Sequence, residues 1–175
     1  GTRDERTFVG ARFGTLDLSS RRIDAGDRFE IDLRHAEIEH LDLTRTAVAQ
    51  PLRLAGAEVG RIDARNASFD GALDLHEFEL EDRGKFAEAE FDGRVICEDA
   101  VFSGQVGFRN ATFGEEVTFA GAAFEEAVFT EVTFDDDVAF RGARFAGDAT
   151  LAGTEFTGGA NVEADDADFS GATFE

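Results

Sequence analysis

The chain has 175 residues and a net charge of −21, from 38 acidic and 17 basic side chains, and its 19 aromatic residues are all phenylalanine. This charge disfavours direct nucleic-acid binding, which needs a basic surface, and a single cysteine, Cys97, excludes an internal disulfide. No apolar run approaches the ~18 residues of a membrane span, so we expect a cytoplasmic protein.

Residues 1–35 are the least regular part of the sequence. Phe13, Leu16 and Leu18 begin an alternation of apolar and polar residues, but Arg21 and Arg22 interrupt it. The end of a repeat protein needs a cover for its apolar side chains and unpaired backbone groups. We therefore expect residues 1–35 to form an irregular first coil or a cap.

From residue 31 onward, aliphatic residues recur two positions apart, as in Ile31-x-Leu33, Leu41-x-Leu43 and Leu52-x-Leu54. A period of two is the pattern of one face of a short strand. The rhythm loosens at residues 73–86, where extra polar residues predict an irregular seam within one domain that covers 1–175.

Phenylalanine then recurs at steps of five or six, each time two residues after a small or β-branched residue. These predicted core residues are Phe102, Phe108, Phe113, Phe119, Phe124, Phe129, Phe134, Phe140 and Phe145. A five-plus-six alternation also fits an eleven-residue helical repeat. However, each of the many glycines would cost about 0.8–1 kcal/mol inside a helix, so the composition favours strands with glycine at the corners.

A unit of five residues cannot bury a phenylalanine alone, so we expect the units to stack as a solenoid. Four units per coil align residues about 21 or 22 apart and give apolar columns. One such column is Ile38, Val59, Leu80, Phe102, Phe124, Phe145 and Phe169, and another is Leu43, Ala64, Phe86, Phe108, Phe129, Leu151 and Phe174.

Units such as Ala111-Thr112-Phe113-Gly114 and Ala122-Ala123-Phe124-Glu125 resemble the pentapeptide-repeat family over roughly residues 11–174. The resemblance implies an all-β, right-handed quadrilateral β-helix with the central residue of each unit pointing inward, here with about eight coils. The chain differs from the family pattern in its preference for Phe and in its mixed five- and six-residue steps. Family members also pair end to end, so an end-to-end homodimer or a longer chain is expected.

The charge is uneven along the chain. Residues 1–87 carry 18 acids and 13 bases, giving −5, whereas residues 88–175 carry 20 acids and 4 bases, giving −16. Acid-rich, lysine-poor surfaces are typical of salt-adapted proteins, where salt screens the repulsion. A DNA duplex also carries one charge per ~1.7 Å, so the sequence leaves salt adaptation and DNA mimicry both open.

No pattern in the sequence specifies a reaction. His35, His40 and His76 are too few and wrongly spaced for a metal site, and the acidic clusters lack the alternating ligands of a calcium loop. No nucleophile or phosphate-loop motif occurs, and Cys97 falls in an inward column, which predicts an inert thiol. We expect no enzyme activity, no metal and no cofactor.

Two classes of function remain in front, and a third is less favoured. The first is a non-catalytic, acidic protein-interaction or scaffold module of a larger salt-adapted protein, with an unknown protein partner. The second, implied by the resemblance to fluoroquinolone-resistance members of the family, is a DNA mimic that inhibits or protects a type II topoisomerase (DNA gyrase). The third is a soluble extension of a membrane protein. The candidate partner-binding acids are Glu115, Glu116, Glu125, Glu126, Asp135, Asp136 and Asp137.

Overall fold

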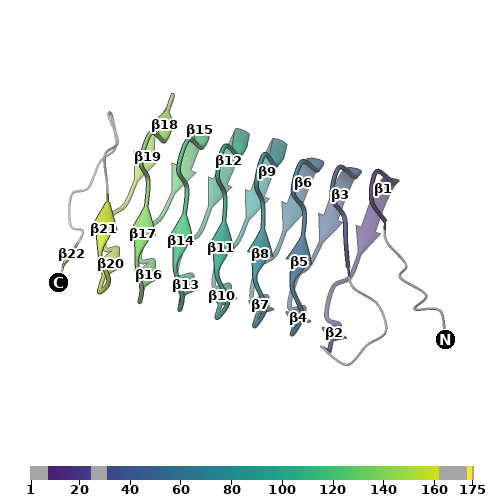
Figure 1. Ribbon diagram of the computed structural model, residues 1–175, viewed down its shortest axis with the longest axis horizontal. Helices are drawn as coiled ribbons and strands as arrows, with labels where there is room; N and C mark the ends of the chain where they lie inside the picture. The colour runs from purple at the N-terminus through teal and green to yellow at the C-terminus, as the bar shows by residue number, and fades with distance from the viewer. Residues whose placement is uncertain (1–7, 25–30, 162–172, 175) are drawn as a thin grey trace.

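The computed structural model describes residues 8–24, 31–161 and 173–174, and all their regular elements are β-strands. Strands of successive coils lie side by side and parallel, and the coils form a rod (Figure 1). The chain is therefore the all-β solenoid that the repeats predict. The seven strand levels from β1 to β18 enclose about six turns in the described residues, whereas the expected eight coils counted all 175.

Three parallel sheets run along the rod. Sheet A contains the longest strands, and its members are β1 (Arg12–Asp17), β3 (Glu37–Asp42), β6 (Glu58–Asp63), β9 (Glu79–Lys85), β12 (Val101–Gly107), β15 (Ala123–Val128), β18 (Arg144–Phe145) and β19 (Ala149–Thr150). Sheet B consists of β2 (Arg22–Ile23), β4 (Ala47–Val48), β7 (Ser68–Phe69), β10 (Glu90–Phe91), β13 (Thr112–Phe113), β16 (Thr133–Phe134), β20 (Glu155–Phe156) and β22 (Thr173–Phe174). Sheet C consists of β5 (Leu52–Arg53), β8 (Leu73–Asp74), β11 (Val95–Ile96), β14 (Val117–Thr118), β17 (Val138–Ala139) and β21 (Ala160–Asn161).

Sheet A supplies two of the four sides of each coil. In β3, Ile38 and Leu41 are both buried although they are three residues apart. Side chains alternate along a straight strand, so both can point inward only if the strand bends between them. We call this position the A bend. Sheets B and C provide the other two sides, and the B–C bend joins them.

Tight turns form the two remaining corners, which we call the A–B turn and the C–A turn. In each, a backbone N–H donates to the carbonyl three residues earlier, as from Thr46 to Leu43 and from Ala57 to Leu54, both at 3.0 Å. The third residue of such a turn has positive φ, and glycines at 56, 121, 142 and 153 meet this need as the sequence predicts. Nine non-glycine residues, including Arg45 and Glu131, occupy the same position in other turns.

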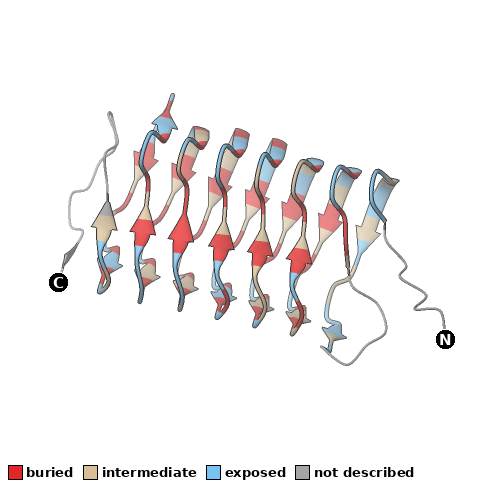
Figure 2. Ribbon diagram, viewed as in Figure 1, coloured by how far each residue is buried: buried red, intermediate tan, exposed pale blue. Residues whose placement is uncertain are grey.

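The core lies along the rod axis between the sheets, where Figure 2 shows buried residues in every strand level from β3 to β17. The nine phenylalanines from Phe102 to Phe145 are each at most 7% exposed. Rings of successive coils stack nearly parallel: the centroids of Phe91 and Phe113 are 4.6 Å apart, and those of Phe113 and Phe134 are 4.9 Å apart. Offset ring stacking adds about 0.5–1.5 kcal/mol per pair beyond the burial of apolar area.

One coil has a large residue at an inward position that is usually small, and a glycine at an inward position that is usually large. Phe78 occupies the position where the coils on either side have Ala57 and Ala100, and it is fully buried. In the same coil, Gly84 aligns with Ile62 and Val106. A Cβ on Gly84 would lie 2.9 Å from a methyl of Leu80, so neighbouring side chains already fill the space. The coil therefore keeps its interior full without the usual order of large and small residues.

The expected seam at residues 73–86 is a local change in sheet A. Strands β9 and β12 each have seven residues, and the pairing register shifts where β9 meets β6 and where β12 meets β15. The two strands pair with each other without a shift, because each holds one extra residue at the A bend. Sheets B and C continue through this region without interruption.

The two ends differ from the expectation in one respect. At the start, β1 and β2 pair with β3 and β4, so the described part of residues 1–35 forms a first coil. At the far end, Phe174 pairs with Phe156 in sheet B, so its predicted place after Leu151 was wrong. Phe169 lies outside the described residues.

Candidate interaction surface

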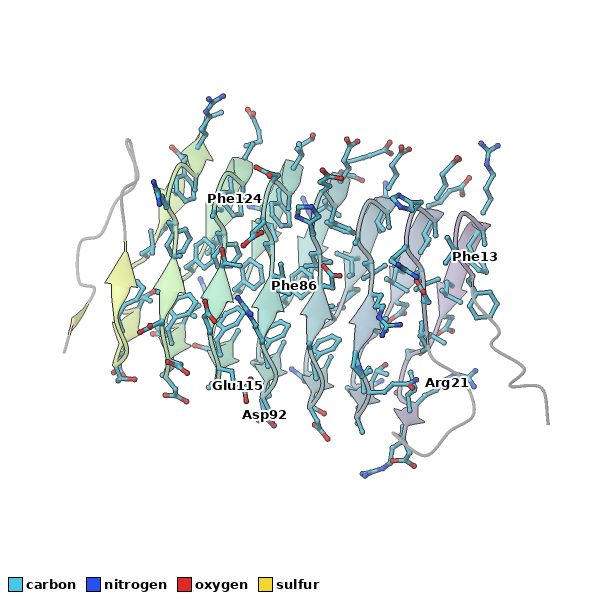
Figure 3. All side chains as sticks on the ribbon, viewed as in Figure 1. Phe13, Arg21, Phe86, Asp92, Glu115 and Phe124 are labelled. Atoms are coloured by element: carbon cyan, nitrogen blue, oxygen red, sulfur yellow. The ribbon has the colours of Figure 1, made fainter. Side chains whose placement is uncertain are left out.

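Five of the seven candidate acids follow the B–C bend. Glu115 and Glu116 lie between β13 and β14, and Asp135, Asp136 and Asp137 lie between β16 and β17, one coil later. All five side chains are exposed, and Figure 3 shows Glu115 projecting from the same edge of the rod as Asp92 of the preceding coil. We call these five residues the B–C ridge.

Backbone contacts hold part of the B–C ridge in place. A carboxylate oxygen of Asp136 accepts a hydrogen bond from the N–H of Asp137, and one of Asp137 accepts from the N–H of Gly159 in the next coil, both at 2.8 Å. Glu116 forms an ion pair with Arg94 at 3.3 Å. Three of the five carboxylates in the row are therefore held by contacts.

The other two candidate acids lie on a different corner. Glu125 and Glu126 are part of β15 at the A bend, and Glu126 accepts a hydrogen bond from Gln105 of β12 at 2.5 Å. Along each coil, the second side of sheet A, the A–B turn and sheet B separate the A bend from the B–C bend. The structure thus places these two acids diagonally across the coil from the B–C ridge and does not gather all seven into one site.

A face without charge lies beside the B–C ridge. The outward positions of sheet C in this half are Ile96 and Ala139, which are half-buried, and Thr118, which is only 5% exposed. The earlier coils have Arg53 and Asp74 at these positions. A hollow of about 350 Å³ opens between this face and the ridge, and Glu116, Asp137 and Ala139 are among its lining residues.

Sequence reasoning missed this face because it followed the large inward residues. The signal was present one residue away, in the loss of charge at the outward position that precedes the inward residue after each of these sheet C strands. Ile96, Thr118 and Ala139 precede Cys97, Phe119 and Phe140 in this way.

Carboxylates of the first half are held differently. The guanidinium of Arg34 binds both oxygens of Asp32, with N–O distances of 2.7 to 3.1 Å, and the Asp32 side chain is only 3% exposed. These hydrogen bonds lower the pKa of Asp32, against the effect of burial. Burial likewise raises the pKa of Asp63, but hydrogen bonds from Arg65 and the charges of Arg65 and Lys85 outweigh it, and the pKa falls.

Groups that could carry chemistry lie apart. His35 and His76 belong to C–A turns of different coils, and His40 lies at the A bend. Cys97 is buried, and burial raises the pKa of its thiol, which keeps it protonated. Within residues 8–24 and 31–161, no three His, Cys, Asp or Glu side chains come together as metal ligands. The acidic cluster Asp165-Asp166 lies outside the described residues.

In the described part of the chain, no helix has the length and apolar character needed to cross a membrane.

Comparison with known proteins identifies the repeats. A family model described as pentapeptide repeats in nine copies matches residues 86–131 and 124–164. None of the curated proteins matches the sequence. Among solved structures, the chain is similar to HetL, a pentapeptide-repeat protein involved in the regulation of heterocyst differentiation in the cyanobacterium Nostoc sp. strain PCC 7120. The two share 18% identity over 95% of this chain and 84% of HetL, with a TM-score of 0.25.

Proposed function

Since this chain belongs to the pentapeptide-repeat family, we propose that it is a non-catalytic interaction module whose B–C ridge and adjoining sheet C face bind a basic surface of a protein partner. The observation that carries the proposal is the uncharged face beside a row of carboxylates, three of which are held by contacts. Ile96 and Ala139 are the more accessible outward residues of this rigid face, and the ridge supplies charge at its border.

The shape of the face suits binding to a preformed partner surface. Ile96, Thr118 and Ala139 sit on strands fixed by the ladder on both sides, so little conformational entropy is lost on contact. Interfaces commonly combine a weakly charged centre with a polar rim. The B–C ridge would form one such rim and would speed association with a basic partner, most strongly at low salt.

Affinity capture tests the proposal with a ridge variant and a control variant. The ridge variant is Asp135→Asn, Asp136→Asn and Asp137→Asn, because asparagine keeps an oxygen that accepts the hydrogen bond from Gly159. The control is Glu125→Gln with Glu126→Gln, which removes acids from the A bend. We expect a partner that the wild type and the control recover and the ridge variant loses.

The recovered protein must then bind in purified form. Calorimetry should give an affinity that falls at least about tenfold in the ridge variant and weakens with added salt. If no protein depends on the ridge, or if the purified pair does not bind, the proposal is wrong.

The spacing of the B–C ridge favours a second candidate, the DNA mimic of a type II topoisomerase. Its five carboxylates occupy two successive coils, and strands of neighbouring coils are ~4.8 Å apart. This gives about one charge per 2 Å, close to the ~1.7 Å of a duplex.

A supercoiling assay with purified gyrase, run across salt concentrations, distinguishes this candidate. Inhibition by the wild type and the control, but not by the ridge variant, would support mimicry. Absence of inhibition at a large molar excess would discard it.

A further inference from the structure

A cationic hollow lies on the second side of sheet A, away from the B–C ridge. It has a volume of about 290 Å³, and its lining residues include Arg65, Arg83, Lys85, Arg109, Gly107 and Val128. No carboxylate is among the residues that line it. Four bases without an acid are unexpected in a chain with 38 acids and 17 bases.

Three successive coils bring these bases together. Lys85 ends β9, and its Cα partners across the sheet are Asp63 of β6 and Gly107 of β12. Arg83 lies at the A bend, and Arg65 and Arg109 lie in A–B turns two coils apart. The cations therefore come from the A bend, from the A–B turns and from the strand between these two corners.

Most of this charge is not compensated by ion pairs. Arg65 binds Asp63 through hydrogen bonds of 2.8 to 3.2 Å. Among the described residues, no side-chain hydrogen bond and no ion pair within 4.0 Å engages Arg83, Lys85 or Arg109, although the charge of Lys85 acts on the neighbouring Asp63. Arg83 and Lys85 also form the wall toward a second hollow that contains Asp63 and Asp82, where Asp82 already pairs with Arg61.

The floor of the hollow is open because of a glycine. A Cβ built on Gly107 would meet no atom within 4 Å, and the residue does not have positive φ. On one side of it stands Lys85 and on the other Val128, its Cα partners in β9 and β15. The missing side chain therefore leaves room between the cations, and packing of the backbone does not explain it.

We propose that this cationic hollow binds a small polyanion that carries at least two oxyanion groups, such as phosphates or carboxylates. Arginine forks and a lysine ammonium are the groups that bind such oxygens through charge-assisted hydrogen bonds. The volume is at the lower end of small-molecule sites, which begin near 300 Å³.

The net charge of the protein argues for a compact ligand. A nucleic acid or an acidic protein would extend beyond the hollow and meet the acidic corners of a chain with a charge of −21. Salt screens such repulsion over about 8–10 Å, so an anion small enough to remain between the four bases experiences mainly their positive charge.

Calorimetric titration of the full chain tests the proposal with inorganic pyrophosphate and, in a separate arm, citrate. The buffer has low ionic strength and no divalent cations, which would bind pyrophosphate. We expect saturable binding at one site. Pyrophosphate alone would identify a phosphate site, whereas binding of both anions would identify a general oxyanion site.

Three variants locate the binding. Lys85→Gln with Arg109→Gln should weaken it by at least about tenfold, and Gly107→Glu should abolish it by filling the hollow with a carboxylate. Arg141→Gln with Arg144→Gln removes two exposed bases of a later coil and should change the affinity less than about twofold. Circular dichroism checks that each variant is folded.

Two results would overturn the proposal. One is the absence of saturable binding of either anion to the wild type. The other is an equal loss of affinity in the hollow variants and in the Arg141 and Arg144 control, which would mean that the anions respond only to the overall charge.

Discussion

The two halves of the rod share one backbone plan but differ in how they distribute apolar bulk and charge. Between residues 31 and 85, the inward columns are mainly aliphatic, and outward positions of sheets A and C carry charges such as Asp32, Asp63 and Arg53. Between residues 86 and 160, stacked rings fill the columns, and the outward positions are mostly small and uncharged. The acids of this half stand largely at the corners.

This difference indicates that a core of stacked aromatic rings occurs together with outward positions that carry few charges. A ring fills the interior more fully than a valine or leucine, and its stacking adds stability that does not depend on the surface. Ion pairs on the faces of the first half, by contrast, each contribute about 0–1 kcal/mol when they are exposed. The second half can therefore leave its faces free for a partner, whereas the first half uses its faces for internal contacts.

The largest expected effect compares two residues of one column. Phe113→Ala should lower the free energy of unfolding by about 3–5 kcal/mol, because Phe113 is fully buried and stacks on Phe91 and Phe134. Val48→Ala in the same column should cost about 2 kcal/mol, since it removes fewer buried carbon atoms than Phe113→Ala does. Urea denaturation followed by far-UV circular dichroism measures both, and equal costs would contradict the difference between the halves.

The junction between the halves depends on close backbone contact at the A bend. A Cβ on Gly104 would overlap the carbonyl oxygen of Asp82, whereas one on Gly107 in the same strand meets nothing. Gly104→Ala should therefore cost more than about 2 kcal/mol, and Gly107→Ala should cost less than about 0.5 kcal/mol. Thermal unfolding compares them, and a tolerated Gly104→Ala would show that β9 and β12 can separate.

The ion pairs of the first half should show in the pH dependence of stability. Because the pKa of Asp32 is lowered from 3.8 in the folded chain, its contribution is present above about pH 4 and is lost as the pH falls below that value. Asp32→Asn should cost about 1–2 kcal/mol at pH 7.

That cost should shrink below about pH 3.8, because the unfolded chain then binds a proton that the folded carboxylate, with its lowered pKa, does not. Urea denaturation at both pH values makes the comparison. A cost that stays constant down to pH 3 would mean that the pair with Arg34 does not depend on charge.

The smallest effect concerns the turns. Glu131 has φ of 56° at a corner where the next coil has Gly153. Glu131→Gly should raise stability by about 0.5–1 kcal/mol, because glycine adopts this conformation without the cost that other residues bear. Gly142→Ala is the reverse control, since its Cβ has space but its φ is 69°. A stabilising Gly142→Ala would contradict this account of the corners.

The inward columns and the glycine corners could be predicted because each depends on residues close together in sequence. The regular recurrence of phenylalanine predicts the column of Phe124 and Phe145, and the glycine at position 121 predicts a turn there. The partner of Phe174 was beyond this reasoning, since the step between units changes wherever a corner takes an extra residue.

The sites were less predictable because they join residues from different coils. Arg65 and Arg109 border one hollow although they are 44 residues apart. Glu116 and Glu125 are close in sequence but lie on opposite corners. Local spacing assigns a residue to a side of the coil only when the number of sides per coil is known. The periodicity gives the step between units but not that number.

Nuclear magnetic resonance of the chain with labelled phenylalanine tests the central feature, the stacking of rings from successive coils. Assignment through single Phe→Leu variants would identify the signals of Phe91, Phe113 and Phe134. Cross-relaxation should join the ring protons of Phe113 to those of Phe91 and Phe134, which are 22 and 21 residues away. Contacts of Phe113 with only its nearest phenylalanines in sequence, Phe108 and Phe119, would contradict the stacked core and with it the flat faces that it supports.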